Sequence, residues 1–163
     1  MRRLAVWTLS GWAAAASAAH LAAATDPRLV DAVKARDVES VRALLKQHVD
    51  VNGAQGDGAT ALHWAAHFDE ATVADLLIRS GARVNAANDV GATPLYLACL
   101  NRSAPMVERL LEAGANPNAA LVSGETVLMT CARTGEAAAV DALLARGADP
   151  NAKEPAHDQT PLM

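Results

Sequence analysis

Aromatic side chains are scarce in this sequence. Phe, Trp and Tyr make up 3% of its 163 residues, although 52% of the residues are apolar. Ala and Leu account for the difference, and this composition is typical of thin helices that pack closely together. The length leaves room for one domain, but the composition does not require that domain to have a single large core.

Clusters of basic residues are also missing. The chain has 14 Lys and Arg against 18 Asp and Glu, which gives a formal net charge of −4. Nucleic acids and anionic membranes are bound through concentrated positive charge. We therefore expect neither of them as a partner.

The sequence lacks the short motifs of the common catalytic sites. It contains no Gly-x-Ser-x-Gly, no phosphate-binding loop and no dinucleotide fingerprint. No serine has a plausible His and acid set on a rigid frame. We therefore expect no enzymatic activity and no cofactor.

A zinc site is the one metal site that the sequence brings to mind. His63 and His67 are four residues apart, with Asp69 and Glu70 close behind them, and imidazoles at this spacing can share a metal ion. The His-Glu-x-x-His pattern is absent, however. We expect no metal ligands here.

What the chain does contain is a repeat. The segments 58–66, 91–99 and 124–132 each begin Gly-x-Thr and follow one another at intervals of 33 residues. The same interval separates a set of Gly-Ala pairs and a set of asparagines. These are Gly81, Gly114 and Gly147, each followed by Ala, and Asn52, Asn85, Asn118 and Asn151. A fixed period of this length indicates a stacked array of small units.

The repeated segment resembles the ankyrin repeat, whose signature is Thr-Pro-Leu-His-x-Ala in a unit of 33 residues. The resemblance implies an all-α solenoid of paired antiparallel helices joined by hairpin loops. It predicts a domain over 25–163 with repeats at about 26–56, 57–89, 90–122 and 123–156, and the start of a fifth at 157–163. The first repeat is degenerate and lacks the Thr-x-Leu motif. His48 stands where later repeats have Gly, so we expect a left-handed backbone there.

The repeated polar residues have structural roles in this interpretation. Thr60, Thr93 and Thr126 should cap an inner helix. In the family this Thr also bonds the motif histidine, which only repeat two keeps, as His63. The repeated asparagines should bridge loops through side-chain bonds to the backbone.

The first 24 residues have the pattern of a signal peptide. Two arginines precede an apolar segment, 4–24, that is free of Asp, Glu, Lys and Arg and ends in small residues. An uncleaved membrane anchor is the alternative, since a segment of about 20 residues spans a bilayer. We expect cleavage, and a bacterial protein that is exported to the periplasm or secreted.

Cys99 and Cys131 could pair in such an oxidising compartment. They occupy nearly equivalent positions in neighbouring repeats, however, and stacked helices lie about 8–10 Å apart. That exceeds the Cα separation of a disulfide, so we expect two small buried side chains without a bond.

The fifth repeat stops after its first residues, at Met163. We expect this to leave the apolar side of repeat four, including Leu128 and Leu143, without a cover. A terminal repeat normally has a polar outer face. The expectation is therefore a fragment of a longer array, or an isolated partial gene product.

The resemblance also implies where a partner would bind. Ankyrin arrays bind proteins on a concave face of hairpin tips and inner-helix surfaces, through positions that vary between repeats. In this chain they include Asp57, His67, Phe68, Asp89, Val90, Leu100, Asn101, Val122, Ser123, Glu125, Arg133 and Thr134.

We therefore expect a non-catalytic scaffold, monomeric, that binds another protein on this face. One alternative is an accessory or protective subunit of a periplasmic enzyme. Another is the N-terminal array of a longer protein with a further C-terminal domain.

Overall fold

The computed structural model describes residues 26–153, which contain eight α-helices. They are α1 (Arg28–Lys34), α2 (Val38–Lys46), α3 (Ala61–His67), α4 (Ala71–Arg79), α5 (Pro94–Leu100), α6 (Ala104–Glu112), α7 (Val127–Thr134) and α8 (Ala137–Ala145). The predicted signal peptide at 1–24 and the partial fifth repeat at 157–163 lie outside the described residues. Within 26–153, no helix has the length and apolar character needed to cross a membrane.

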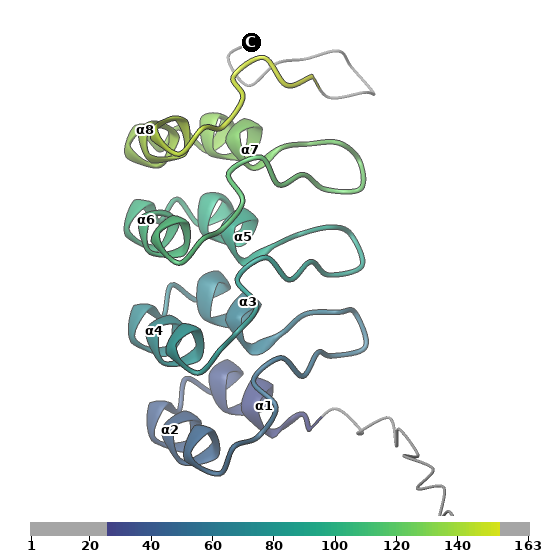
Figure 1. Cartoon of the computed structure of the whole chain (residues 1–163), viewed down its shortest axis with the longest axis vertical. Helices are drawn as coiled ribbons and strands as arrows, with labels where there is room; N and C mark the ends of the chain where they lie inside the picture. Colours follow the sequence, from purple (N-terminus) through teal and green to yellow (C-terminus); the bar gives the residue numbers. More distant parts are fainter. Residues whose placement is uncertain (1–25, 154–163) are drawn as a thin grey trace, which may run out of the picture.

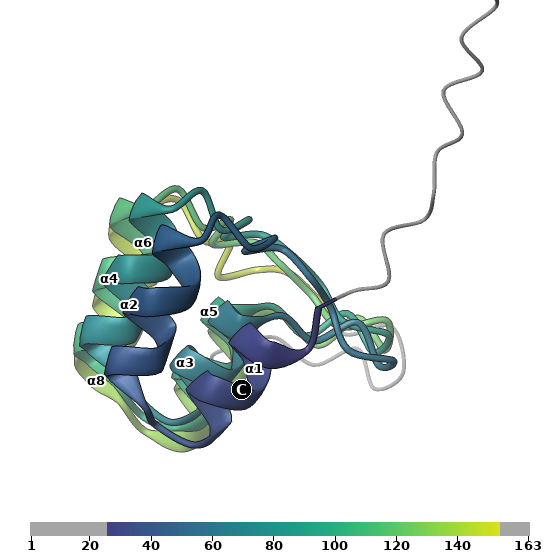
Figure 2. The same cartoon turned by 90° about the horizontal axis from the view of Figure 1, so that it is seen from below.

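The helices form four antiparallel pairs stacked along one axis (Figure 1). The odd-numbered helices make an inner column and pack on one another from α1 to α7, and each packs on the even-numbered helix that follows it. Seen along the stack, the outer helices, inner helices and hairpin loops form three successive layers (Figure 2). The predicted all-α solenoid is confirmed.

Each helix is seven to nine residues long, too short to be stable alone in water. Side-chain caps help to begin them. Thr93 accepts a hydrogen bond from the amide of Tyr96, and Thr126 from that of Met129. The Ser103 hydroxyl accepts a hydrogen bond from the amide of Met106 at the start of α6, whose first two residues are Ala104 and Pro105. Packing between repeats must supply the rest of the stability.

The core runs through the whole stack as a band of small and aliphatic side chains. Ala65 and Ala98 are fully buried on the inner helices, where small side chains allow close approach. Leu128 and Leu143 are also buried, so the expectation that they lack a cover is wrong. The helices of repeat four pack on each other and on α5 and α6.

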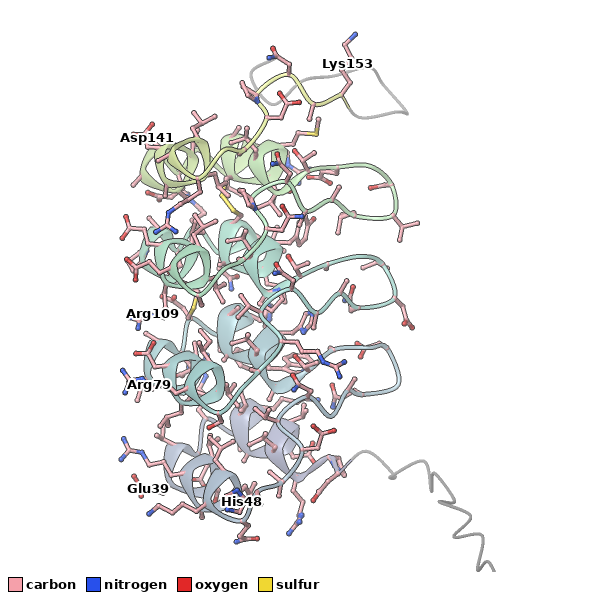
Figure 3. The ribbon with its side chains drawn as sticks, viewed as in Figure 1. Glu39, His48, Arg79, Arg109, Asp141 and Lys153 are labelled. Atoms are coloured by element: carbon pink, nitrogen blue, oxygen red, sulfur yellow. A yellow bond between two sulfur atoms is a disulfide. The ribbon has the colours of Figure 1, made fainter. Side chains whose placement is uncertain are left out.

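Charged side chains line the outer side of the stack. Figure 3 shows Glu39, Arg79, Arg109 and Asp141 along the outer column of helices. Because that column presents charge to solvent, the inner helices and the hairpins are the faces where an apolar surface has to be sought.

The hairpin loops are joined to one another through their backbones. The amide of Asp89 donates to the carbonyl of Asp57, and that of Val122 to the carbonyl of Val90, both at 3.0 Å. Gly91 makes this approach possible: its φ is +84°, and a Cβ there would lie 2.8 Å from the backbone nitrogen of Val122. The hairpins therefore form a continuous, rigid row.

Asparagine side chains make the second link between repeats, as predicted. The Asn85 side-chain amide donates to the carbonyl of Gly114 at 2.9 Å, and its oxygen accepts from the amide of Asn116 at 2.7 Å. Asn52 and Asn118 form the same pair of bonds to their following repeats. The predicted left-handed backbone at His48 is also confirmed, with a φ of +57°.

Cys99 of α5 and Cys131 of α7 form a disulfide with their Cα atoms 4.8 Å apart. The expectation of two unbonded thiols is therefore wrong. It confused the distance between helix axes with the distance between facing Cα atoms. Since each Cα lies about 2.3 Å from its axis, axes about 8–10 Å apart bring facing Cα atoms to roughly 3.5–5.5 Å.

Cys99 and Cys131 are 32 residues apart, one fewer than the repeat period of 33, and this difference is part of the same explanation. Ala132, not Cys131, is the full-period equivalent of Cys99. Equivalent residues point the same way in a stack and do not face each other. One residue earlier, the side chain is rotated by about 100° around the helix, which turns Cys131 toward the preceding repeat.

Candidate partner-binding surface

The sequence-predicted binding residues fall on the hairpin row and at the carboxyl ends of the inner helices. Most of them are exposed, while Phe68, Glu125 and Thr134 are half-buried. On the hairpins are Asp57, Asp89, Val90, Val122, Ser123 and Glu125, and at the helix ends are His67, Phe68, Leu100, Asn101, Arg133 and Thr134.

An aromatic cluster lies at the end of α3. The rings of Trp64 and Phe68 are stacked with centroids 5.7 Å apart, and His67 packs at 5.8 Å from Trp64 and 5.0 Å from Phe68. Trp64 and Phe68 are half-buried and His67 is exposed. The helix spacing explains the contact, because residues three and four apart share one face.

Two cations from repeat one cover part of this cluster. The Lys34 ammonium lies 4.6 Å from the ring centroid of Trp64, and the Arg36 guanidinium lies 5.0 Å from that of Phe68. Arg36 also pairs with Glu70 at 3.5 Å. Cation–π contacts of this kind contribute about 0.5–1 kcal/mol at exposed sites, so they orient the rings without removing them from solvent.

A pocket of about 170 Å³ opens beside Trp64, between repeats two and three. Its lining comes from four segments: two hairpins, α3 and α5. The lining residues are Asp57, Ala59, His63, Trp64, His67, Asn88 and Leu97. The indole nitrogen of Trp64 donates to the Gln55 side chain at 3.0 Å, which fixes the ring at the edge of the pocket.

His63 lines the pocket and has a structural role. Its Nδ1 accepts from the amide and the hydroxyl of Thr60, at 3.1 and 2.9 Å, so the other nitrogen carries the proton and Nε2 donates to the carbonyl of Ala92 at 3.0 Å. Burial lowers the pKa of this imidazole from its ordinary value, against smaller opposing effects of the Ala92 carbonyl and the Asp57 carboxylate. The family's Thr–His bond is thus present in repeat two.

Neither of the other two motif positions reproduces this network. Met129 offers its sulfur to the amide of Thr126 at 3.4 Å, and no such bond from Tyr96 to Thr93 is formed in repeat three within the described residues. The network is incomplete, as the sequence predicts.

Several predicted binding residues already use their polar groups inside the array. The Asn101 side-chain amide donates to the carbonyls of Ala66 and His67. The Thr134 hydroxyl donates to the carbonyls of Cys131 and Cys99, and Glu125 pairs with Arg133. These side chains support the inner helices, so a partner would compete with bonds that already exist.

The hairpin tips carry the most exposed aliphatic side chains of the described residues. Val122 is 81% exposed and Val90 59%, while Leu100, at the end of α5, is 45% exposed. Together with the aromatic cluster they give the inner side of the stack an apolar surface. The outer side also has an exposed apolar side chain, Leu144 of α8, which is 38% exposed.

Sequence reasoning missed Trp64 and Leu97, and the two cations Lys34 and Arg36. Trp64 lies inside the repeated motif segment, where a large side chain suggests core. A signal was nevertheless present: the positions at full-period distance from Trp64 are Asp31, Leu97 and Thr130. So varied a set indicates a position that the repeat does not fix, although one of its members, Thr130, is fully buried.

Metal ligands are not grouped on this surface. Within residues 26–153 no three His, Cys, Asp or Glu side chains are placed to hold an ion. Both nitrogens of His63 are already bonded, which leaves His67 as the accessible imidazole of the pair.

The sequence profile of one protein family, described as "Ankyrin repeats (3 copies)", matches residues 29–121 and, in a second overlapping match, residues 73–154. Together the two matches include every helix except the first residue of α1. No curated protein matches the chain.

Proposed function

We propose that this chain, which belongs to the ankyrin-repeat family, is a non-catalytic scaffold that binds another protein on its inner-helix and hairpin face. The observation that carries the proposal is the aromatic cluster of Trp64, His67 and Phe68, which lies on the surface beside a pocket. Ankyrin repeats generally mediate protein–protein interactions.

The energetic argument concerns where the apolar side chains lie. Trp64 and Phe68 remain partly exposed in a chain with one other aromatic residue, Tyr96, in its described part. Aromatic side chains that become fully desolvated in an interface often contribute a large share of its binding energy. A rigid array can present such a surface without the cost of ordering it on binding.

A scaffold without catalysis agrees with the titratable groups. Of the described residues, Asp26, Arg28, Asp37 and His63 have a clearly shifted pKa. The first three are on the surface near the N-terminus, and His63 is buried with both nitrogens bonded. Active sites normally combine shifted groups in one cleft, and of these four groups His63 alone lines the pocket beside Trp64.

We place the protein outside the cytoplasm, in the periplasm or beyond it. Two features support this location: the signal-peptide pattern of residues 1–24 and the Cys99–Cys131 disulfide. Disulfides persist mainly in oxidising compartments. The acidic net charge further supports a protein partner over nucleic acid or an anionic membrane, and we propose that the chain acts as a monomer.

Site-specific photo-crosslinking tests the scaffold proposal. A photoreactive amino acid at Leu100, on the inner face, should crosslink one stoichiometric partner in periplasmic extract, and Phe68→Ala should lower the yield. The matched control carries the same amino acid at Glu108, exposed on α6. Equal crosslinking from both positions, or none from a folded sample, would overturn the proposal.

The identity of the captured partner then separates two related functions. An enzyme that co-purifies with the chain would make it an accessory subunit. A non-enzymatic partner would leave the chain as a general binding scaffold.

A further inference from the structure

We propose that the pocket beside Trp64 receives a basic side chain, Lys or Arg, of the protein partner. This inference rests on the proposed scaffold function and adds the chemistry of one contact. The aliphatic stem of the partner side chain would lie along Trp64 and Leu97, with its cationic head at the carboxylate of Asp57.

The charge of the pocket comes from one side. Asp57 is the only lining residue with a fixed charge, and it is exposed. Its Oδ1 accepts from the amide of Ala59 at 3.0 Å, a bond that holds the carboxylate in place. The hairpin segments 53–60 and 86–93 contain Asp57 and Asp89 and no Lys or Arg. An incoming cation therefore meets no like charge on the hairpin side.

The walls of the pocket suit the stem of such a side chain. Ala59, Trp64 and Leu97 provide apolar surface, and the His63 imidazole, which also lines the pocket, is neutral because it is buried and bonded. Lys and Arg bury their methylene stems on apolar surface while their charged heads stay near water. An Asp or Glu side chain of a partner would contact the same apolar wall, but the Asp57 carboxylate would repel it.

The ring of Trp64 already accepts one cation within the chain. Lys34 reaches it from α1, the helix that precedes α3 in the stack, whereas Asn88 and Leu97 complete the pocket from the repeat that follows α3. Lys34 therefore comes from the repeat before α3, whereas part of the pocket lining comes from the repeat after it. The ammonium of Lys34 should still repel a second cation weakly, which gives the proposal a second, opposite test.

The experiment uses ¹⁵N-labelled full-length protein and an acetylated, amidated Gly-Gly-Arg-Gly-Gly peptide. Addition of the peptide should shift the indole resonance of Trp64 and the amides of Asp57 and Asn88 in the NMR spectrum. Trp64→Phe identifies the indole signal among those of the three tryptophans. The peptide with citrulline in place of Arg, which keeps the shape and removes the charge, should bind at least about threefold more weakly.

Three variants separate charge from fold. Asp57→Asn keeps the bond to Ala59 and should weaken binding of the Arg peptide about threefold or more. Asp141→Asn, exposed on the outer helix α8 and outside the pocket lining, should leave it unchanged. Lys34→Gln should strengthen it. Equal binding of the citrulline peptide, or unchanged binding to Asp57→Asn, would overturn the proposal.

An acidic occupant is the other outcome that would overturn it. In that case a Gly-Gly-Glu-Gly-Gly peptide, and not the Arg peptide, would shift Trp64, and Lys34→Gln would abolish the effect. Either failure leaves the photo-crosslinking result at Leu100 untouched, so loss of this inference is distinguishable from loss of the scaffold function.

Discussion

Removal of the Cys99–Cys131 disulfide should loosen the C-terminal half of the array. The two cysteines are 32 residues apart in the sequence. The bond closes a loop that contains all of α6 and the third hairpin. In the chain-entropy treatment, a loop of this length raises the free energy of unfolding by about 3.7 kcal/mol at 25 °C. For a folded part of this size that corresponds to about 10 °C in melting temperature.

The location of the loss follows from the nearest-neighbour character of the stack. Each repeat contacts only its neighbours, so the cross-link acts on the opening of repeats three and four and has little direct effect on repeats one and two. Backbone amides of α7 and α8 should therefore exchange faster with deuterium in the reduced protein. Those of α3 and α4 should change less.

The assay compares oxidised wild type with protein that is unfolded, reduced and refolded in reductant. Reduction needs the unfolded chain because Cys99 and Cys131 are fully buried in the folded one. Cys99→Ala/Cys131→Ala serves as a second comparison and adds the cost of two small cavities. A melting temperature within about 2 °C of the oxidised protein, with unchanged exchange in α7 and α8, would refute the reasoning. It would mean that packing alone holds the last repeats.

Three further predictions concern the links between repeats. Gly91→Ala should lower the free energy of unfolding, measured by urea denaturation, by about 2 kcal/mol or more, because the backbone there is left-handed and the new Cβ would clash with Val122. Gly56→Ala is the control: the position has open space around it, so the substitution should be near neutral in the same assay. Asn85→Ala removes two bonds to the following repeat and should cost about 1–2 kcal/mol in the same assay; an unchanged urea midpoint would show that these exposed bonds contribute nothing net. Burial lowers the pKa of His63 in the folded state, so the unfolded chain binds the extra proton first as the pH falls. The free energy of unfolding should therefore fall as pH drops below the ordinary imidazole value of 6.5. A urea midpoint as high at about pH 5.5 as at about pH 7.5, or a decline that His63→Gln does not reduce, would contradict this.

The sequence predicts most of the architecture because the repeat exposes it several times over. The recurring Thr, Gly and Asn positions indicate the caps, the turns and the bridging bonds. Thr93 and Thr126 cap their helices, and Asn52, Asn85 and Asn118 form the bridges, whereas the Thr60 hydroxyl contacts His63. A regular period constrains the fold far more tightly than local propensity does, because one assignment of helices and loops must fit every unit of the repeat.

Contacts between repeats were harder to predict. The disulfide depends on which side of α7 faces α5. Cys131, one residue before the equivalent of Cys99, lies on that side, and the spacing in the sequence alone does not reveal this. The pocket depends on Trp64 and Leu97, from different repeats, meeting hairpin residues. Pattern analysis within one unit identifies variable positions, as it did for His67 and Phe68, but it does not show which of them become neighbours.

The asparagine bonds between successive repeats have a consequence for how such a chain can change length. Asn52, Asn85 and Asn118 each reach a carbonyl 29 residues later and an amide 31 residues later. Duplication of a whole unit preserves every one of these pairings, whereas an insertion or deletion of a few residues between the partners leaves donors and acceptors unpaired on both sides. The array should therefore tolerate the gain or loss of a complete repeat better than a change of a few residues within one.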